Sequence, residues 1–238
     1  MNITIVGAGR AGSAFSRALV SVGHRVTLVH HDDTFSLVDA HVVLLCVPDG
    51  EVAATAARLA PSDSRVVAHV AGSLTLAALS AHPRVASLHP LVALPTPERG
   101  ASRLRGATYC VAGDPLAADV VVSLGGRILT VDEHQRALYH ATAVVASNHL
   151  VALMAQVRDL AEAAGLTLED FLPLARAALD DVAEFGPTVA LTGPASRGDV
   201  TTIERHLAVM PEAQRETYVA MAKAAATEAE RQRLRAVV

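Results

Sequence analysis

Two histidines stand where apolar segments of the chain end, and an imidazole at such a position could move a proton to or from a bound ligand. His69 closes the run Arg65–His69, and His89 follows the run Val85–Leu88. The proline after His89 restricts its backbone. An unperturbed imidazole has a pKa of about 6.5, so it can donate a proton to a carbonyl oxygen that is being reduced. We take His89 as the candidate proton donor, against the alternative of a structural histidine that bonds a loop carbonyl; the role of His69 stays open.

Further polar side chains could orient a ligand. Ser73 follows the fourth apolar run and could contact the ligand, or it could simply cap a helix. On the apolar segment 133–164, His140 could be a second acid–base group, and Asn148 could orient a carbonyl or carboxamide. The alternative for His140 and for His149 is hydrogen bonding between helices, because buried polar groups need partners.

A glycine-rich loop at residues 192–199 carries the cation best placed to hold a substrate carboxylate, Arg197. Asp199 either fixes Arg197 or, more simply, caps the helix that follows. A metal site is not indicated. The chain has 11 histidines, but it has no tight cysteine–histidine spacing and no H-E-x-x-H motif.

The chain opens with a phosphate-binding pattern, Gly7-Ala8-Gly9-Arg10-Ala11-Gly12, between an apolar run and a helical stretch. The first glycine permits a tight turn, the second lets the backbone approach a pyrophosphate, and the third lets helix and strand pack closely. The backbone N–H groups that begin the helix then face the phosphates. We expect these six residues to bind a dinucleotide; the alternative is the same turn with an empty site.

The end of the second expected strand indicates which dinucleotide fits. An acidic residue there binds the ribose 2′-hydroxyl of NAD, whereas a cation accommodates the 2′-phosphate of NADP. His31 and Arg10 could hold the phosphate, and Asp32 could hold the hydroxyl. We favour NADP, while NAD stays open.

In a parallel sheet the carboxyl ends of the strands line the ligand crevice. Val47-Pro48-Asp49 closes the third expected strand, so we expect Val47 and Pro48 to wall the cofactor. Asp49 could do no more than cap the next helix. For the same reason, we expect Ser73 and His89 to lie near the nicotinamide.

Short β-branched runs alternate with helical stretches over the first 130 residues, which predicts βαβ units and a mostly parallel, doubly wound sheet. After about Asp132 only helical patterns remain, beginning with one long helix over 133–164. We therefore expect a Rossmann NAD(P)-binding domain over residues 1–131 and an all-helical substrate and dimerisation domain over residues 132–238. We expect the proline-rich stretch Pro90–Pro97 and the residues Glu98–Gly106 after it to form a loop inside the first domain. The expected strands are Ile3–Val6, Arg25–Val29, Val42–Cys46, Arg65–His69, Val85–Leu88, Thr108–Val111 and Arg127–Thr130, and the expected helices between them are Gly12–Val22, Asp49–Leu59, Ser73–Ala81 and Pro115–Leu124.

The later helices have recognisable starts and stops. Thr167 offers an N-cap for a helix that Gly186 and Pro187 end. Thr201-Thr-Ile-Glu204 has capping-box spacing before another helix, and the last helix begins at Met210-Pro211-Glu212.

Composition excludes several classes of protein. An apolar share of 51% with 18% charged residues excludes a disordered chain. The net charge of −4 without a basic run argues against a nucleic-acid partner, and no uninterrupted apolar stretch predicts a membrane span. Two cysteines in apolar runs and no signal peptide favour the cytoplasm. The single lysine, Lys223, excludes most mechanisms that need an active-site lysine.

A helix as apolar as the segment 133–164 must be buried over most of its surface. Because a chain of 238 residues can scarcely cover it, we expect a homodimer formed through the helical domain. We expect the active site between the two domains, at the carboxyl edge of the sheet.

Six segments together resemble the bacterial Rossmann-like proteins with a DUF2520 domain, and the resemblance covers nearly the whole chain. The last two segments are the most specific. The resemblance implies a candidate NADP-dependent oxidoreductase, related in architecture to 6-phosphogluconate dehydrogenase-like enzymes, ketopantoate reductase and pyrroline-5-carboxylate reductase. The segments are GAGRAG, VPDGEV, HVAGSLTL, SLHPLVALP, ALYHATAVVASNHLVAL and ALTGPASRGDVTTIERHL.

Wider comparisons support one residue and weaken one mechanism. His89-Pro90 resembles the His-Pro of prephenate dehydrogenases, whose histidine acts on the substrate hydroxyl. Ketopantoate reductases and β-hydroxyacid dehydrogenases use a helix lysine, and the segment 133–164 has none. A direct transfer of their mechanism to this chain is therefore in doubt.

The leading hypothesis is reduction of a carbonyl or imine on a small, carboxylate-bearing substrate by NADPH. His89 would donate the proton, Asn148 and Ser73 would orient the substrate or nicotinamide, and Arg197 would hold a carboxylate. A ketopantoate-like substrate fits this scheme. The rival hypotheses are a non-catalytic NADP-binding sensor or scaffold dimer, and a structural dimer with a vacant crevice.

Overall fold

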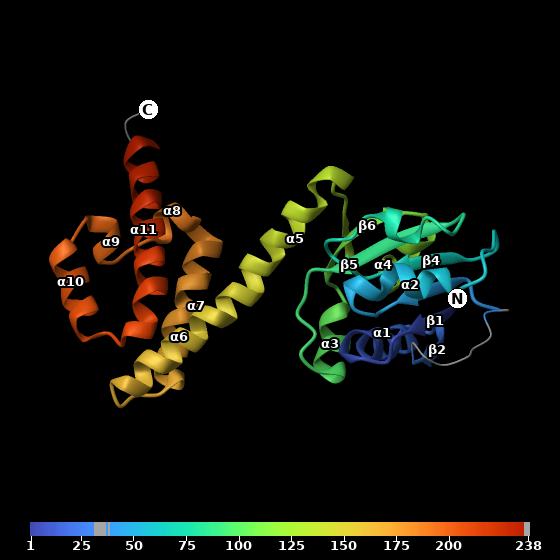
Figure 1. The fold of residues 1–238 in the computed structure, drawn as a ribbon, viewed down its shortest axis with the longest axis horizontal. Coiled ribbons are helices and arrows are strands. Elements are labelled where there is room, and N and C mark those ends of the chain that lie inside the picture. The colour runs from blue at the N-terminus through green and yellow to red at the C-terminus, as the bar shows by residue number, and fades with distance from the viewer. Residues whose placement is uncertain (31–36, 38, 236–238) are drawn as a thin grey trace. The chain divides into compact units, whose positions relative to one another are not determined.

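The computed structural model describes residues 1–30, 37 and 39–235, and the chain divides into two compact units. The first unit is Met1–Ser147 and the second is Asn148–Val238. Within the described residues, the first unit holds the β-sheet with helices packed on it, and the second unit is made of helices (Figure 1).

Seven strands form one sheet in the first unit, in the order β2-β1-β3-β4-β5-β6-β7. The strands β1 to β5 pair in parallel, β6 runs antiparallel to β5, and β7 runs parallel to β6. The predicted Rossmann-type, mostly parallel sheet is confirmed, and each predicted strand is present within one or two residues of its expected ends. The strands are β1 (Asn2–Val6), β2 (Arg25–Val29), β3 (Val42–Leu45), β4 (Val66–His69), β5 (Val85–Pro90), β6 (Thr108–Gly113) and β7 (Arg127–Leu129).

Two apolar clusters cover the two faces of the sheet, as expected for strands whose residues are apolar without alternation. One face packs against α1 (Arg10–Ser21), α3 (Pro97–Leu104) and α4 (Leu116–Ser123). The other face packs against α2 (Val52–Ala57) and a single 3₁₀ turn, Leu76–Leu79. Burial on both faces fixes the register of the strands and therefore the positions of the residues that follow them.

The structure corrects the expected loop over residues 98–106, because Pro97–Leu104 is the helix α3. The Thr96 side chain accepts a hydrogen bond from the backbone N–H of Arg99 at 3.3 Å, and Pro97 occupies the first helical turn, where a missing N–H costs nothing. Leu104 is buried against the sheet. An N-cap, an early proline and one buried leucine are sufficient for two helical turns in a segment rich in arginine.

The expected helix Ser73–Ala81 is shorter than predicted, and only Leu76–Leu79 is helical, as a 3₁₀ turn. Thr75 occupies the N-cap position of this turn. Ser73 therefore does not cap a helix, and its hydroxyl donates instead to the carboxylate of Asp49.

The long helical stretch predicted over 133–164 is interrupted by a π-helical segment, Val145–His149. A 3₁₀ turn (Glu133–Gln135) and α5 (Arg136–Val144) precede it, and α6 (Leu150–Ala163) follows it. Along the chain, the boundary between the two compact units falls within this segment, between Ser147 and Asn148. The predicted domain boundary at 131 instead lies just after the last strand of the sheet. The difference has a physical cause, since side chains at the start of α5 contact Ala71, which follows β4, and His89, near the end of β5.

By length and composition alone, the helical stretch Glu133–Ala163 could cross a membrane, and none of its most apolar window is buried within the described residues. An apolar helix that is covered by another protein surface has the same composition. Leu138 and Val151 are each 69% exposed, so these side chains could contact either a membrane or another protein surface.

The second unit contains α6 and five further helices. Thr167 precedes α7 as predicted. The backbone N–H and the hydroxyl of Thr167 both donate hydrogen bonds to the carboxylate of Asp170, each at 2.9 Å. The predicted start of the last helix at Pro211 and Glu212 is confirmed. The helices are α7 (Leu168–Phe185), α8 (Pro187–Ala190), α9 (Pro194–Arg197), α10 (Val200–Val209) and α11 (Glu212–Arg235).

The capping box predicted at Thr201–Glu204 is wrong, because α10 begins earlier, at Val200. The Asp199 carboxylate accepts a hydrogen bond from the backbone N–H of Thr202 at 3.0 Å and caps the helix. Asp199 therefore has the simpler of the two roles considered for it, while its charge still lies near Arg197.

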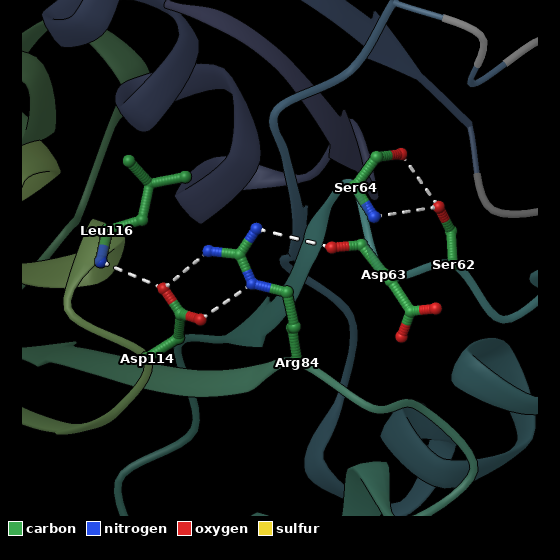
Figure 2. A network of polar contacts seen from close by, with 6 residues as sticks. All are labelled: Ser62, Asp63, Ser64, Arg84, Asp114 and Leu116. Carbon is green, nitrogen blue, oxygen red and sulfur yellow. Dashed lines mark hydrogen bonds and ion pairs between the residues drawn. The ribbon is translucent and has the colours of Figure 1, made fainter.

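A paired arginine and aspartate join the antiparallel strands β5 and β6 at one end (Figure 2). Arg84 Nε and Nη2 donate to the two carboxylate oxygens of Asp114 at 2.9 and 3.1 Å, and Arg84 also reaches the carbonyl oxygen of Asp63 at 3.5 Å. Asp114 in turn accepts from the backbone N–H of Leu116 at the start of α4. One carboxylate thus ties β5, β6 and α4 together, and the hydrogen bond from Arg84 lowers its pKa.

We expect Asp114→Asn to lower the Tm by a few degrees at pH 7, because the amide cannot accept both guanidinium bonds. The folded-state pKa of Asp114 lies below its unfolded value, so this contribution is complete above about pH 4 and is lost as pH falls through the lowered pKa. Thermal unfolding followed by circular dichroism from pH 7 to pH 3 measures it, with Asp119→Asn on α4 as the control. An equal loss in both variants, or a difference that does not narrow as pH falls, would contradict the assignment.

Candidate active site

The glycine pattern after β1 forms the tight turn that the sequence predicts. Gly7 has a φ of +107°, and a Cβ there would lie 2.4 Å from the carbonyl oxygen of Cys46. A Cβ on Gly12 would lie 1.8 Å from the carbonyl oxygen of Gly7. A Cβ on Gly9, in contrast, would meet nothing within 4 Å. The first and third glycines are therefore required by packing within the chain, and the second leaves an open approach to the backbone.

The start of α1 has the features of a phosphate-binding helix terminus. Gly9 is its N-cap residue, no side chain caps it among the described residues, and its first turn holds no acidic residue. The backbone N–H groups of the first turn and the helix dipole therefore favour an anion. Arg10 is exposed in the first turn. The side chains of Ala8 and Ala11 are too small to cover the backbone N–H groups of that turn. These residues fit a pyrophosphate. His31 and Asp32, the residues considered for the ribose 2′ position, lie outside the described residues.

The loop after β3 links the glycine turn to the loop after β4. Val47 Cγ1 lies 3.2 Å from the position of a Cβ on Gly7, and Pro48 precedes a 3₁₀ turn, Asp49–Glu51. Asp49 does not cap this turn; its carboxylate accepts a hydrogen bond from the Ser73 hydroxyl at 2.9 Å. The structure thus brings Val47, Asp49 and Ser73 along one edge of the sheet.

A cluster of two imidazoles and one phenol stands at the end of β5. His89 Nδ1 lies 2.7 Å from the hydroxyl of Tyr139, with the two rings edge to face. The ring of His140 also meets His89 edge to face, with centroids 5.7 Å apart. A Cβ on Gly72 would lie 2.8 Å from His89 Nε2 and 2.3 Å from His140 Cδ2. The bare backbone of Gly72, next to Ser73, is therefore the surface on which both imidazoles rest.

The environment of His89 differs from the ordinary imidazole assumed from sequence. Burial, followed by the nearby His140 and Arg136, lowers the pKa of His89 to about 4, while Asp49 opposes them. His89 is therefore neutral at pH 7. A neutral imidazole donates from one nitrogen only, so which nitrogen carries the hydrogen decides what His89 can do.

Arg136, which sequence reasoning missed, is the charged group at the base of this cluster. It is only 3% exposed, and it donates from Nη2 to the carbonyl oxygen of Ala71 at 3.1 Å and from Nη1 to Cys110 Sγ at 3.7 Å. Its Nε has no hydrogen-bond partner within the described part of the chain. Residues 136, 139 and 140 share one helix face, and this spacing was the available signal.

His69 is fully buried within the sheet, so its side chain is not exposed to a ligand. Its Nε2 lies 3.4 Å from the carbonyl oxygen of Thr75, and burial lowers its pKa. Its Nδ1 and the hydroxyl of Ser87, its partner across β4 and β5, lack hydrogen-bond partners in the described chain. The structural alternative fits His69 better than the catalytic one.

Three of the predicted or considered residues belong to the second unit. Asn148 and His149 are exposed in the π-helical segment, and Arg197 is exposed at the end of α9. The groups that the structure does bring together, His89, His140 and Ser73, all lie in the first unit.

Comparisons with known proteins give a family for the second half of the chain and a fold for nearly all of it. Residues 109–225 match the model of a family described as a domain of unknown function, DUF2520. No curated protein matches the sequence.

Solved structures share the fold at low sequence identity. A candidate NADP oxidoreductase of Bacteroides fragilis, BF3122, is 20% identical with a TM-score of 0.80, covering 95% of this chain and 98% of its own. Protein TM1727 of Thermotoga maritima is 22% identical with a TM-score of 0.72, covering 97% and 99%. A reductive aminase of Aspergillus terreus, solved with NADPH and ethyl-5-oxohexanoate, is 15% identical with a TM-score of 0.68, covering 95% and 94%. At these identities the likeness establishes the fold.

We expect Gly72→Ala to destabilise the protein by about 1–3 kcal/mol, the usual cost of overpacking, because the new methyl group would overlap both imidazole rings. Gly50→Ala is the matched control, since a Cβ at Gly50 meets nothing within 4 Å. Urea denaturation of the two variants measures the difference. Equal stability of the two would show that the rings do not rest on Gly72.

Proposed function

We propose that this chain, whose residues 109–225 form a DUF2520 domain, is an NADPH-dependent reductase of a small substrate with a C=O or C=N bond. One observation carries the proposal. A phosphate-binding turn, the carboxylate–hydroxyl pair Asp49–Ser73 and the imidazoles of His89 and His140 follow one another along a single edge of a Rossmann-type sheet. NADPH in a reductive aminase of the same fold supports the choice of cofactor.

The residues that would hold NADPH are those of the glycine turn. The backbone of Gly7 to Gly12 and the first turn of α1 would bind the pyrophosphate, and Val47 and Pro48 would wall the cofactor. Arg10, together with His31, would bind the 2′-phosphate that distinguishes NADPH from NADH. When bound, NADPH supplies a hydride, and the protein supplies alignment and charge.

The remaining side chains would act on the substrate. His89 would pass a proton to the substrate oxygen or nitrogen, and Ser73, held by Asp49, would orient the substrate or the nicotinamide. His140, which lies against Gly72 beside His89, would act as a second acid–base group on the substrate. We assign Asn148 to orienting the carbonyl and Arg197 to a substrate carboxylate, which favours a keto acid such as ketopantoate or a cyclic imino acid.

Titration with NADPH and NADH, followed by the fluorescence of the nicotinamide, tests the cofactor. The absence of tryptophan removes the usual background. We expect NADPH to bind more tightly than NADH, and Gly9→Asp to abolish binding, because a carboxylate would occupy the phosphate position. Val122→Asp, which adds the same charge at a residue that is 63% exposed on α4, is the control and should bind normally.

Turnover separates a reductase from a sensor. Oxidation of NADPH in the presence of ketopantoate or 1-pyrroline-5-carboxylate supports the reductase, with turnover falling sharply in His89→Gln. Binding without turnover on any keto acid or imine favours a non-catalytic NADP sensor. Failure of both nucleotides to bind would overturn the oxidoreductase proposal.

We also propose that two copies of the chain associate through the helical part. The helix α7 has no buried residue, and several large apolar side chains of the second unit are exposed. Burial of such a surface against a second copy is the most direct way to remove it from water. The exposed side chains are Val151, Leu166, Leu174, Leu179, Val182, Phe185, Val189, Val200, Val209 and Met221.

The two buried free thiols, Cys46 and Cys110, suit a reducing compartment, and we place the protein in the cytoplasm.

Sedimentation velocity over a range of concentrations tests the dimer. We expect Leu174→Glu to shift the protein toward the monomer, because Leu174 is 69% exposed on α7 and would lie in the interface. Val20→Glu, at a residue that is 55% exposed on α1, is the control and should leave the dimer intact. A wild-type chain that sediments as a monomer at every concentration would refute this proposal.

A further inference from the structure

We propose that Tyr139 and Arg136 complete a proton relay with His89. The Tyr139 hydroxyl gives its proton to His89 Nδ1 while His89 Nε2–H gives its own to the substrate, and Arg136 holds the negative charge left on Tyr139. The relay rests on the proposed reductase function and assigns the proton source within it. It makes Tyr139 the terminal proton donor and Arg136 a positioning and charge-balancing residue.

The direction of the relay follows from what each imidazole nitrogen faces. His89 Nδ1 is 2.7 Å from the Tyr139 hydroxyl, while His89 Nε2 points to the bare backbone of Gly72, beside Ser73. A neutral imidazole has one N–H, and a phenol readily donates to the nitrogen that lacks it. If Tyr139 donates to Nδ1, the hydrogen of His89 stands on Nε2, on the side of Gly72 where a substrate would lie.

The surroundings of His89 disfavour the protonated imidazolium, so His89 can pass a proton on but does not hold an extra one. Burial, His140, Arg136 and His69 all lower the pKa of His89, and Asp49, which raises it, does not outweigh them. An imidazolium is therefore scarce at pH 7. A neutral His89 can pass a proton to a strongly basic oxygen only if another group replaces that proton, and Tyr139 is in contact with it.

Arg136 supplies the charge that the relay needs. It is 97% shielded from solvent, and no carboxylate pairs with it among the residues that the structure describes. A buried cation without a counter-charge is costly. Cys110 Sγ lies against both Arg136 and the Tyr139 hydroxyl, so the guanidinium is close to the phenol. Negative charge on Tyr139 would balance the guanidinium.

The resting state and the reacting state differ in which group holds the proton. Burial raises the pKa of Tyr139 more than Arg136 lowers it, so the phenol stays protonated at rest. Hydride addition moves the π electron pair of the C=O bond onto oxygen, and the resulting alkoxide is a stronger base than a phenolate. The alkoxide takes the Nε2 proton, and Nδ1 takes the phenol proton. Solvent then delivers one proton to Nε2 while Nδ1 returns its proton to the phenolate, which restores both groups. Protons and charges balance, with the hydride taken from NADPH.

The position of the hydrogen on His89 can be measured without any cofactor or substrate. Long-range ¹H–¹⁵N spectra of the apo protein with ¹⁵N-labelled histidine report the tautomer, and the signal absent from His89→Gln identifies His89. We expect Nε2–H in the wild type and no fixed tautomer in Tyr139→Phe. We also expect His89 to titrate at higher pH in Arg136→Met, which removes a neighbouring positive charge. An Nδ1–H tautomer in the wild type would overturn the relay.

Turnover with ketopantoate or 1-pyrroline-5-carboxylate as probe completes the test. We expect Tyr139→Phe to lower kcat by about 100-fold or more, the usual range for loss of a proton donor, with the Kd for NADPH unchanged. The control is Tyr218→Phe, because Tyr218 makes the same kind of contact in the second unit: its hydroxyl is 2.6 Å from His206 Nδ1, with the rings edge to face. Tyr218→Phe should alter the His206 signal and leave turnover unchanged.

The two proposals fail in different ways. Normal NADPH binding with wild-type turnover in Tyr139→Phe would overturn the relay and leave the reductase standing. A wild-type protein that binds no NADPH would overturn the reductase and the relay with it. A loss of turnover in Tyr139→Phe that is accompanied by weaker NADPH binding would show a structural role and would also overturn the relay.

Discussion

Parallel pairing of the first five strands is the constraint on which the candidate site depends. Because β1 to β5 run in one direction, the residues after each of them emerge at the same edge of the sheet. The glycine turn, the Val47 loop, the loop of Gly72 and Ser73, and His89 come from four different strands and still form a continuous series. The close approach of Gly7 and Gly12 to the chain around Cys46 sets the spacing at one end of that series.

Burial decides the chemistry at the other end of the series. The ring of His89 and the guanidinium of Arg136 are taken out of water by α5 and by the backbone of Ala71 and Gly72. Burial disfavours the charged imidazole, and repulsion from His140 and Arg136 adds to the effect, so the pKa of His89 is lowered and the ring is neutral. A site that holds a cation but no carboxylate partner for it among the described residues is suited to a reaction that creates negative charge.

The second unit shows a different relation between sequence and burial. Its helices α6 and α7 carry many apolar side chains, yet α7 has no buried residue and α6 buries only Ala161. The unit is held by polar contacts as well, including those of Gln214 with Gln156 and Asp159. Apolar surface that the chain does not cover itself is the physical reason to expect a second copy.

The sequence alone determined the strands, the glycine turn and the helix start at Thr167, because each depends on residue types within a few positions of one another. It mistook Pro97–Leu104 for a loop, since one buried leucine gives little periodic signal. Only the tertiary structure joined His89 to Tyr139 and buried Arg136, because these contacts span about 50 and 65 residues of chain. No local pattern records a hydrogen bond of that range, and the pKa of His89 depends on it. Residue chemistry is therefore readable from sequence, whereas protonation is decided by which distant groups the sheet edge brings together.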